Sequence, residues 1–399
     1  MTEKNLDFDL VIDRQNTNSL KFDFAAEKGM PEHILPLWVA DMDFRISSHI
    51  QEALYKQAEH GIFGYSEAKG DYFAALSSWM ETHHGWKVHE NWLVKTPGVV
   101  FALAMAIKAF TKEGDGVIIQ QPVYYPFSEV IKDNDRKIIN NSLVQNKNGK
   151  YEMDFADLEE KMMKEKAKLF FLCNPHNPVG RVWRKEELER LGELCRKYHV
   201  IVVSDEIHGD FVYEGRHQVF ADVKKEYRDF TITCTSPSKT FNIAGLQVSN
   251  IFIANPGLRG KFKKQIAAAG YSQINAQGLI ACQSAYAKGE EWYQAMLAYI
   301  RENLLFMKEF LETRIPEIKM TMPEGTYLAW LDFRKLGLAD CQLEELIVKK
   351  AGLWLDSGRI FGDGGKGFQR INAACPRETL KLALTRLEEA VKEMHSLLP

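Results

Sequence analysis

A chain of 399 residues is long enough for one large domain and a smaller one, and its 45% hydrophobic content is typical of a globular protein with a sizeable core. The formal net charge of −3 provides no basic field for nucleic acid or an anionic membrane. The six cysteines occur singly, which argues against a metal centre or a disulfide framework. A polar N-terminus without a signal sequence, and no apolar run of about 18 residues, predict a soluble cytoplasmic protein without a membrane span.

The N-terminal part, residues 1–48, predicts an arm and not a folded layer. Residues 1–35 are polar with little periodicity, and we expect them to lie on another surface, either of the same chain or of a second subunit. The apolar run Leu35–Phe44 includes two acids near its end, Asp41 and Asp43. It has two interpretations, a buried strand end or the wall of a ligand cleft.

Two helices with a tight loop between them are predicted next. Helical spacing is present at 49–60 and 71–83, and the glycines of Gly61–Tyr65 indicate the loop. Tyr65 is either a packed aromatic residue or a ligand contact. Further on, Gly98 starts an apolar helix, which leaves the first N–H groups free and favours an anion in front of them. A buried helix without a ligand would have the same pattern.

Tyr124 and Tyr125 follow a short apolar strand at 116–120 and lie between two prolines. Aromatic rings at a strand end can offer a flat face to a planar ligand. Plain packing of the two rings is the alternative.

Helices alternate with unbroken apolar strands in the middle of the chain. The predicted order is helix, strand, helix, strand, at Asp154–Lys166, Lys168–Cys173, Lys185–Tyr198 and Val200–Ser204. This alternation predicts an α/β fold, with a mostly parallel sheet covered by helices on both faces. Ligands of such sheets collect at the carboxyl ends of the strands. Polar residues follow the apolar runs there, namely Asn174, Asn177, Asp205 and Ser236.

The C-terminal part predicts a smaller α+β domain. After a strand at 249–253, its expected elements are helices at 258–269, 277–288 and 291–314, a strand at 326–333, and helices at 343–351 and 378–398. We therefore expect an arm at 1–48, a large domain at 49–288 and a small domain at 289–399.

Lys239 lies in a turn of small hydroxyl residues after the β-branched run 230–234. A lone loop lysine is usually solvated, but a lysine kept in a cleft and partly neutral can form an imine. A buried Asp205 would need a partner, and the N–H of a pyridinium ring is one, because a protonated ring nitrogen lets a pyridoxal ring accept electrons. A capped acid at a strand end is the other interpretation of Asp205.

The sequence resembles a known family at these motifs. Asn174–Gly180 (Asn-Pro-His-Asn-Pro-Val-Gly), Ser204–His208 (Ser-Asp-Glu-Ile-His) and Ser236–Asn242 (Ser-Pro-Ser-Lys-Thr-Phe-Asn) resemble the fold-type I, aminotransferase-like pyridoxal-phosphate enzymes. Leu37–Phe44 and Pro122–Phe127, together with the loop before Tyr65 and the turn at Gly98, resemble the cystathionine β-lyases and C–S lyases of the MalY/PatB type. The resemblance runs from about residue 30 to the C-terminus. It implies a large domain with a mostly parallel seven-stranded sheet, and a pyridoxal 5′-phosphate cofactor.

The resemblance also implies roles for individual residues. Lys239 would form the Schiff base and Asp205 would pair with the pyridine nitrogen, with Lys239 and Tyr124 as the catalytic residues. The other implied cofactor contacts are Asn177 at the ring hydroxyl, Tyr124 stacked on the ring, His208 beside it, Gly98, Val99, Val100, Ser236 and Ser238 around the phosphate, and Tyr65 reaching the phosphate of the neighbouring subunit of a homodimer. The implied substrate contacts are Arg370 at the α-carboxylate, Val39, Ala40, Tyr125 and Asn177.

Two departures from the aminotransferase pattern favour the lyase branch. His208 stands where aminotransferases of this fold usually have tyrosine, and Gln247 stands where they often have a phosphate-binding arginine. The expected activity is α,β-elimination of L-cystathionine or a related cysteine S-conjugate to a thiol, pyruvate and ammonia, with Lys239 removing the Cα proton. An aminotransferase, and a regulatory or binding protein on the same fold, are the alternatives.

Overall fold

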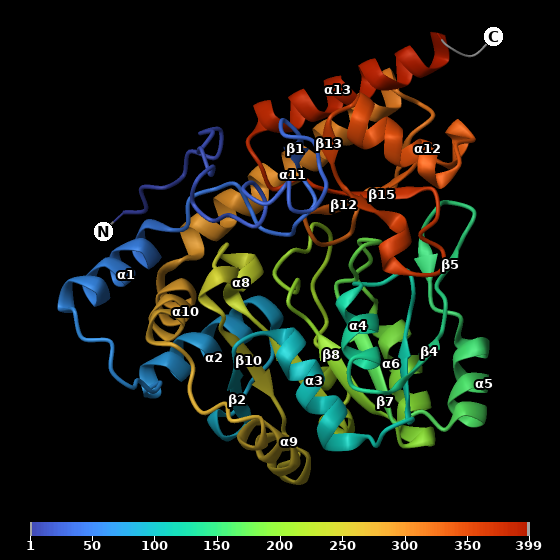
Figure 1. Ribbon diagram of the computed structural model, residues 1–399. Helices are drawn as coiled ribbons and strands as arrows, with labels where there is room; N and C mark the ends of the chain where they lie inside the picture. Colours follow the sequence, from blue (N-terminus) through green and yellow to red (C-terminus); the bar gives the residue numbers. More distant parts are fainter. Residues whose placement is uncertain (1, 397–399) are drawn as a thin grey trace.

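The computed structural model describes residues 2–396, so the end of the predicted helix 378–398 lies outside the described residues. A seven-stranded sheet forms the lower part of the molecule in Figure 1. Its strands are, in spatial order, β2 (Leu93–Thr96), β10 (Ser249–Phe252), β9 (Thr231–Thr235), β8 (Ile201–Asp205), β7 (Leu169–Cys173), β3 (Gly116–Ile119) and β4 (Lys137–Asn140). Only β10 is antiparallel to its neighbours in this sheet. The prediction of a mostly parallel seven-stranded sheet is confirmed.

Helices cover both faces of this sheet because its strands are apolar on both sides. In β7, Phe170 and Leu172 belong to one buried cluster, whereas Leu169 and Phe171 belong to another, as the alternation of side chains along a strand requires. One cluster includes helices α3 (Val99–Phe110), α4 (Pro126–Lys132) and α9 (Pro256–Ala268). The other includes α5 (Phe155–Glu165), α6 (Lys185–Tyr198) and α7 (Phe220–Val223). The short helix α8 (Pro237–Thr240) follows β9.

The C-terminal part has its own antiparallel sheet, in the upper part of Figure 1. Its order is β11 (Lys319–Met320), β12 (Leu328–Asp332), β15 (Phe368–Asn372) and β14 (Asp356–Ser357). The helices of this part are α11 (Glu290–Arg314), α12 (Asp340–Glu344) and α13 (Arg377–Ser396).

Two of the elements predicted for the C-terminal part differ in extent from those in the structure. The predicted strand 326–333 begins only at Leu328, because Thr326 has a left-handed φ of 68° that a strand does not accommodate. The predicted helix 343–351 is the end of α12 followed by a π-helical turn, Glu345–Lys350.

Helices α1 (Ser48–His60), α2 (Gly70–His84) and α10 (Ala276–Lys288) pack together beside the large sheet. Two small two-stranded sheets complete the fold. One pairs β1 (Leu35–Pro36) with β13 (Leu353–Trp354), and the other pairs β5 (Val144–Gln145) with β6 (Tyr151–Glu152). The buried cluster around α11 and α13 also includes residues of α1, α2 and α10. The division of the chain at residues 48 and 288 therefore stays a prediction.

The N-terminal arm forms turns, without a helix or strand between residues 2 and 34. Its end, Trp38–Asp43, which we call the strap, is tied down by two asparagines. Asn372 Nδ2 donates to the carbonyls of Val39 and Asp41 at 2.9 and 2.6 Å, and Asn242 bonds to the backbone N–H of Met42 at 2.9 Å. The strap is thereby fixed to β15 of the C-terminal sheet and to the segment that follows α8.

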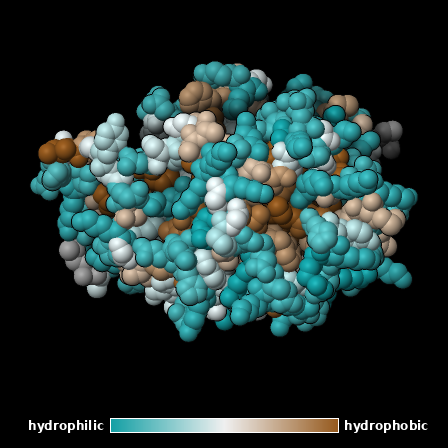
Figure 2. Space-filling view, turned by 90° about the horizontal axis from the view of Figure 1, so that it is seen from below, coloured by the Kyte–Doolittle hydropathy of each residue, from teal (hydrophilic) through white to brown (hydrophobic). Residues whose placement is uncertain are grey.

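Seen from below, the surface is mostly hydrophilic, with apolar side chains gathered near the middle of that face (Figure 2). Within residues 2–396, no helix has both the length and the apolar character needed to cross a bilayer.

Candidate active site

The carboxyl ends of three adjacent parallel strands bring the predicted site residues together. Cys173 at the end of β7 pairs with Asp205 in β8, and Asp205 pairs with Cys234 in β9. The loop with Asn177 follows β7, and α8 with Lys239 follows β9. Residues far apart in the sequence therefore meet at one edge of the sheet, as parallel topology requires.

Asp205 is 4% exposed, and its carboxylate accepts a hydrogen bond from the backbone N–H of Ile207 at 3.2 Å. Burial raises the pKa of Asp205 to about 7, while that hydrogen bond and the charge of Lys239 act in the opposite direction. An ionised Asp205 is therefore stabilised by a cationic partner.

Lys239 lies in α8, whose first residue is Pro237 and whose N-cap is Ser236. Its Nζ donates a hydrogen bond of 2.7 Å to the backbone carbonyl of Ala40 in the strap. Burial lowers the pKa of Lys239 to about 8, with Asp41 and Asp205 raising it and Arg370 lowering it further. The lysine, the aspartate and the arginine thus act on one another electrostatically within one site, and part of the Lys239 amine is neutral near pH 7.

Arg370, in β15, lies opposite Asp356 of β14 and forms a buried ion pair with it. Its Nη1 donates to Asn177 Oδ1 and its Nη2 to the carbonyl of Trp38, both at 2.9 Å. Three of the five guanidinium N–H groups are therefore engaged, counting the bond to Asp356. Its buried Nε has no hydrogen-bond partner among residues 2–396. Arg370 therefore has the Nε–H group and one Nη1–H group left for a further anion, whereas both N–H groups of Nη2 are engaged.

Tyr124 and His208 complete the walls. The backbone N–H of Tyr124 donates to the carbonyl of Asn177 at 3.0 Å, and burial raises the pKa of the Tyr124 phenol. His208 is 3% exposed, and its Nδ1 has no partner in the described chain. Burial, with the positive charges of Lys239 and Arg370 nearby, places the pKa of His208 well below the ordinary value. His208 is therefore a neutral imidazole.

The proposed anion site lies at the start of α3. Gly98 is its N-cap, and a Cβ atom there would meet nothing within 4 Å, so open space lies beside this backbone. Val99 is buried, and Val100 is 38% exposed. Ser236 Oγ lies 2.7 Å from the carbonyl of Val248 and 2.8 Å from Ser238 Oγ, and its one hydrogen can go to only one of these acceptors. When Ser236 donates to Ser238, the Ser238 hydrogen is free for an outside anion, whereas when Ser236 donates to Val248, Ser238 donates to Ser236 and neither hydrogen is free.

Four other predicted residues lie outside the group described so far. Val39 and Ala40 lie in the strap, where they present backbone carbonyls to Asn372 and Lys239. Tyr125 packs edge-on against Phe361 with ring centroids 6.0 Å apart, and Asp356 adds to burial in raising its pKa. Tyr65 is 98% exposed in the loop between α1 and α2, so the chain does not bring it to its own site.

Sequence reasoning missed two groups at this site. The hydroxyl of Tyr327 donates to the carbonyl of Ala40 at 2.9 Å, so Tyr327 and Lys239 share one acceptor. Asp356 is the ion partner of Arg370. Neither residue lies in a motif, and the nearest available signal for Asp356 would have been the need of a buried arginine for a carboxylate.

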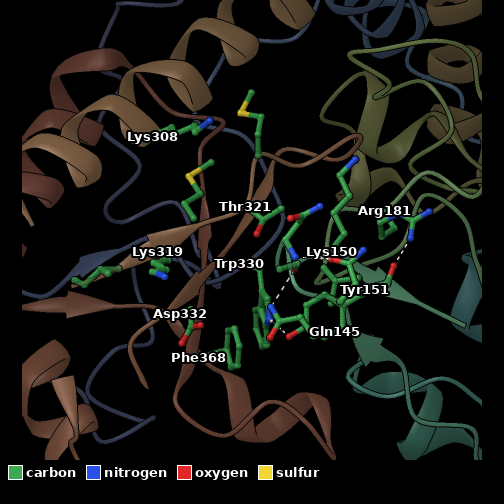
Figure 3. A pocket seen from close by; sticks show the side chains of 18 of the residues that line it. Gln145, Lys150, Tyr151, Arg181, Lys308, Lys319, Thr321, Trp330, Asp332 and Phe368 are labelled. Carbon is green, nitrogen blue, oxygen red and sulfur yellow. Dashed lines mark hydrogen bonds between the residues drawn. The ribbon is translucent and has the colours of Figure 1, made fainter. Parts of the chain in front are cut away.

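A separate cavity of about 650 Å³ lies between the β5–β6 hairpin and the C-terminal sheet (Figure 3). Its lining includes Tyr151, Arg181, Trp330 and Phe368, and Trp330 Nε1 donates a 3.2 Å hydrogen bond to the Tyr151 hydroxyl. None of the predicted site residues lines it. The candidate active site is therefore the strand-end cluster around Lys239.

The chain has a seven-stranded sheet, with a buried aspartate at the end of β8 and a half-buried lysine after the adjacent parallel strand β9. This arrangement defines the class of fold-type I pyridoxal-phosphate enzymes. The model of the aminotransferase class I and II family matches residues 32–387, and the chain belongs to this family. It is 44% identical over 387 residues to cystathionine beta-lyase PatB of Bacillus subtilis, covering 97% of this chain and 100% of the relative. It is 33% identical to protein MalY of Escherichia coli, covering 97% and 99%. Cystalysin from Treponema denticola, solved with pyridoxal 5′-phosphate, superposes with a TM-score of 0.94 at 40% identity, covering 97% and 99%. The resemblance to the MalY/PatB branch is confirmed.

Proposed function

We propose that this protein is a pyridoxal-phosphate-dependent carbon–sulfur β-lyase that converts L-cystathionine or a related cysteine S-conjugate to a thiol, pyruvate and ammonia. The observation that carries this proposal is that Lys239 and Asp205 lie at the carboxyl ends of the adjacent parallel strands β9 and β8, where the charge of each acts on the pKa of the other. Their pKa values of about 8 and about 7 are those of an amine that can become neutral and of a buried carboxylate that favours a cationic partner. The named lyases among the relatives support the choice of reaction.

The residues fit the cofactor at each of its polar groups. Asp205 would hold the ring nitrogen protonated, and Asn177 would bind the ring hydroxyl. The backbone N–H groups at the start of α3 and the Ser238 hydroxyl would hold the phosphate, beside the space that Gly98 leaves open. Tyr124 would cover the ring. When bound, the cofactor supplies an electron sink for negative charge at the substrate Cα.

The chain's own groups then account for the elimination. The remaining N–H groups of Arg370 bind the substrate α-carboxylate, which orients the Cα–H bond toward Lys239. The neutral Lys239 amine removes the Cα proton, and the Cβ–S bond breaks to release a thiolate. With water, the three-carbon remainder gives pyruvate and ammonia. His208, being neutral, adds no positive charge beside Lys239, which keeps the amine basic enough to accept the proton.

An assay with L-cystathionine tests this function directly. We expect equal amounts of pyruvate and free thiol from the purified protein in the presence of pyridoxal phosphate, and no activity for Lys239→Ala. An aminotransferase would form a keto acid that retains sulfur and would release no thiol, and this result would reject the lyase. Since about 1.4 kcal/mol in barrier is a tenfold change in rate, both products should be measured on the same samples.

We further propose that the enzyme is a homodimer in which Tyr65 reaches the phosphate in the neighbouring subunit. Tyr65 is 98% exposed, and Tyr55, Ile62 and Phe63 nearby are 65%, 68% and 58% exposed, which is an unusual set of bare apolar side chains around one loop. A cofactor phosphate without an arginine at Gln247 would gain a hydrogen bond from this tyrosine.

Mixing two defective variants tests the shared site. Lys239→Ala removes the amine from its own site, whereas Tyr65→Ala damages the site of its partner. In a hybrid dimer of the two, one of the two sites has both residues intact, so random mixing should restore about a quarter of wild-type activity. Light scattering should give twice the chain mass. No recovery on mixing, or a monomer mass, would reject the shared site without affecting the proposed reaction.

A further inference from the structure

A second polar cluster, which we call the histidine pair, lies next to the active site and has no part in the reaction proposed above. His217 Nε2 lies 2.8 Å from Glu206 Oε2, and His84 Nε2 lies 2.9 Å from Asp210 Oδ1. All four side chains are at most 9% exposed. The two rings are nearly perpendicular, with centroids 5.3 Å apart.

Both carboxylates are anchored by other donors. Glu206 Oε1 accepts from Ser204 Oγ at 2.7 Å and from the backbone N–H of Phe220 at 3.0 Å. Asp210 Oδ1 also accepts from Trp79 Nε1 at 3.0 Å, and Asp210 Oδ2 accepts from the Thr240 hydroxyl. The cluster thus runs from Glu206, which follows Asp205 in the chain, to Thr240, which follows Lys239.

The histidine pair leaves two buried atoms without partners. Nδ1 of His84 and Nδ1 of His217 are both buried, and neither has a hydrogen bond to any of residues 2–396. Both histidines line a cavity of about 10 Å³, together with Glu206 and Asp210. Buried polar groups are rarely left unpaired, and a polar cavity of this size holds one water molecule.

A metal ion does not fit this cavity. Within the described chain, no group of three or more His, Cys, Asp or Glu side chains is arranged to hold one. The carboxylates also face the Nε2 atoms, so the free Nδ1 atoms are the only ring nitrogens left for a ligand. A ligand in this cavity must then be small and neutral, and it must form a hydrogen bond with each of the two Nδ1 atoms.

We propose that one buried water molecule bridges Nδ1 of His84 and Nδ1 of His217 and completes a positioning network from Glu206 to Thr240. In this network each ring donates its Nε2–H to a carboxylate and accepts a hydrogen from the water at Nδ1. The water supplies two hydrogens and the rings supply two acceptors, so the hydrogen bonds balance. Through Asp210 and Thr240 the network fixes α8, and hence Lys239, relative to the end of β8.

The water can be tested without the cofactor. In a high-resolution crystal structure of the cofactor-free protein, we expect a density peak within hydrogen-bond distance of both Nδ1 atoms. Nitrogen NMR of ¹⁵N-histidine-labelled protein should show two rings with a protonated Nε2 and an unprotonated Nδ1, assigned through His84→Gln and His217→Gln. A dry cavity, or two protonated Nδ1 atoms near pH 7, would overturn the proposal.

The positioning role, which rests on the proposed function, is tested at Thr240. Thr240→Val keeps the shape of the side chain but removes the hydroxyl that Asp210 accepts. We expect the loaded enzyme to lose about tenfold in kcat with little change in KM, and the visible absorbance after addition of pyridoxal phosphate to develop about tenfold more slowly. Thr240→Ser should recover both to within about twofold.

Circular dichroism and the melting temperature show whether the Thr240→Val protein folds. If it folds and both rates equal those of wild type, the positioning role is rejected. If wild type itself never develops visible absorbance, the proposed function fails, while the crystallographic and NMR results on the water still stand.

Discussion

Lys239 Nζ donates a 2.7 Å hydrogen bond to the backbone carbonyl of Ala40, a residue 199 positions earlier in the chain. The same carbonyl accepts a 2.9 Å hydrogen bond from the hydroxyl of Tyr327, the residue immediately before β12. The amine of the active site is therefore held between the N-terminal strap and the C-terminal sheet. Any change that loosens the strap should reach Lys239 through this one acceptor.

The amine itself should titrate at an unusually low pH. The pKa of Lys239 in the cofactor-free protein is lowered to about 8, chiefly by burial. Only the neutral amine attacks an aldehyde, so the rate at which added pyridoxal phosphate gains visible absorbance should rise with pH and be half-maximal at about pH 8. Stopped-flow absorbance measures this rate, with Lys239→Ala as the blank. A midpoint near 10.5, the ordinary lysine value, would contradict the burial that the structure gives Lys239.

Asp205 should destabilise the cofactor-free protein at neutral and alkaline pH. Its folded pKa of about 7 lies above the ordinary 3.8, so the folded state holds more protons than the unfolded state between these values. The contribution of the protonated Asp205 carboxyl to the free energy of unfolding is therefore complete below about pH 4, and it is lost as the pH rises through 7. Asparagine cannot ionise, so Asp205→Asn should be about 2–4 kcal/mol more stable than wild type at pH 8 and nearly equal at pH 4.

Urea unfolding of the two cofactor-free proteins at both pH values checks this expectation. The exposed Asp133 provides the matched control, since Asp133→Asn should leave the stability difference within about 0.5 kcal/mol at either pH. In the presence of pyridoxal phosphate the order should reverse, because asparagine cannot hold the ring nitrogen protonated. Equal stability of wild type and Asp205→Asn at pH 8 would show that Asp205 already has a cationic partner within the chain.

Arg370 and Asp356 should behave as a coupled buried pair. Arg370→Ala leaves Asp356 buried without its cation, which typically costs about 3–5 kcal/mol of stability. Adding Asp356→Asn should recover a large part of this loss, because the uncompensated charge is then gone. Chemical denaturation of the four proteins of the double-mutant cycle measures the coupling. Independent, additive effects of the two substitutions would mean that the ion pair does not form in solution.

Activity separates a second role of Arg370 from its role in stability. Arg370→Lys keeps the charge near Asp356 but loses the planar fork. We expect KM for L-cystathionine to rise about 10²-fold, since lysine lacks the Nε and Nη1 donors that remain for the substrate carboxylate, while the melting temperature falls less than for Arg370→Ala. An unchanged KM would remove Arg370 from the substrate site.

The strap should depend on an ion cluster in the arm. Lys21 has a fully buried side chain and lies 2.8 Å from Asp43, and Arg14 lies 2.7 Å from both Asp41 and Asp43. Lys21→Met leaves two aspartates with one arginine, so we expect a loss of about 3 kcal/mol or more in stability. Lys147→Met, at an exposed lysine, is the control and should change stability by less than about 0.5 kcal/mol.

The same variant tests how the strap acts on the amine. A loosened strap admits water to Lys239, so the pH midpoint for the gain of visible absorbance should move from about 8 toward the ordinary lysine value of 10.5. A midpoint that stays at about 8 in Lys21→Met would mean that the strap keeps its place without this cluster.

Elements defined by local pattern were predictable. The bounds of α6, Lys185–Tyr198, agree with the prediction, because apolar residues at helical spacing are a local signal. The strands β7 and β8 were predictable because a run of apolar residues without alternation indicates a strand buried on both faces. Less local features were not found, such as the antiparallel direction of β10, which only its pairing with β2 and β9 decides.

By itself the sequence determined the parallel sheet, the polar residues at its strand ends, and the pairing of a lysine turn with an aspartate that points to pyridoxal phosphate. Short-range chemistry sets these features, since side-chain type and spacing along one segment are enough to produce them. Only the tertiary structure decided that Ala40 accepts the lysine hydrogen bond, that Tyr327 shares this acceptor and that Asp356 takes part of the Arg370 fork. A backbone carbonyl has the same chemistry at every position, and a buried ion partner is chosen by which strands meet, so neither leaves a mark in the local sequence.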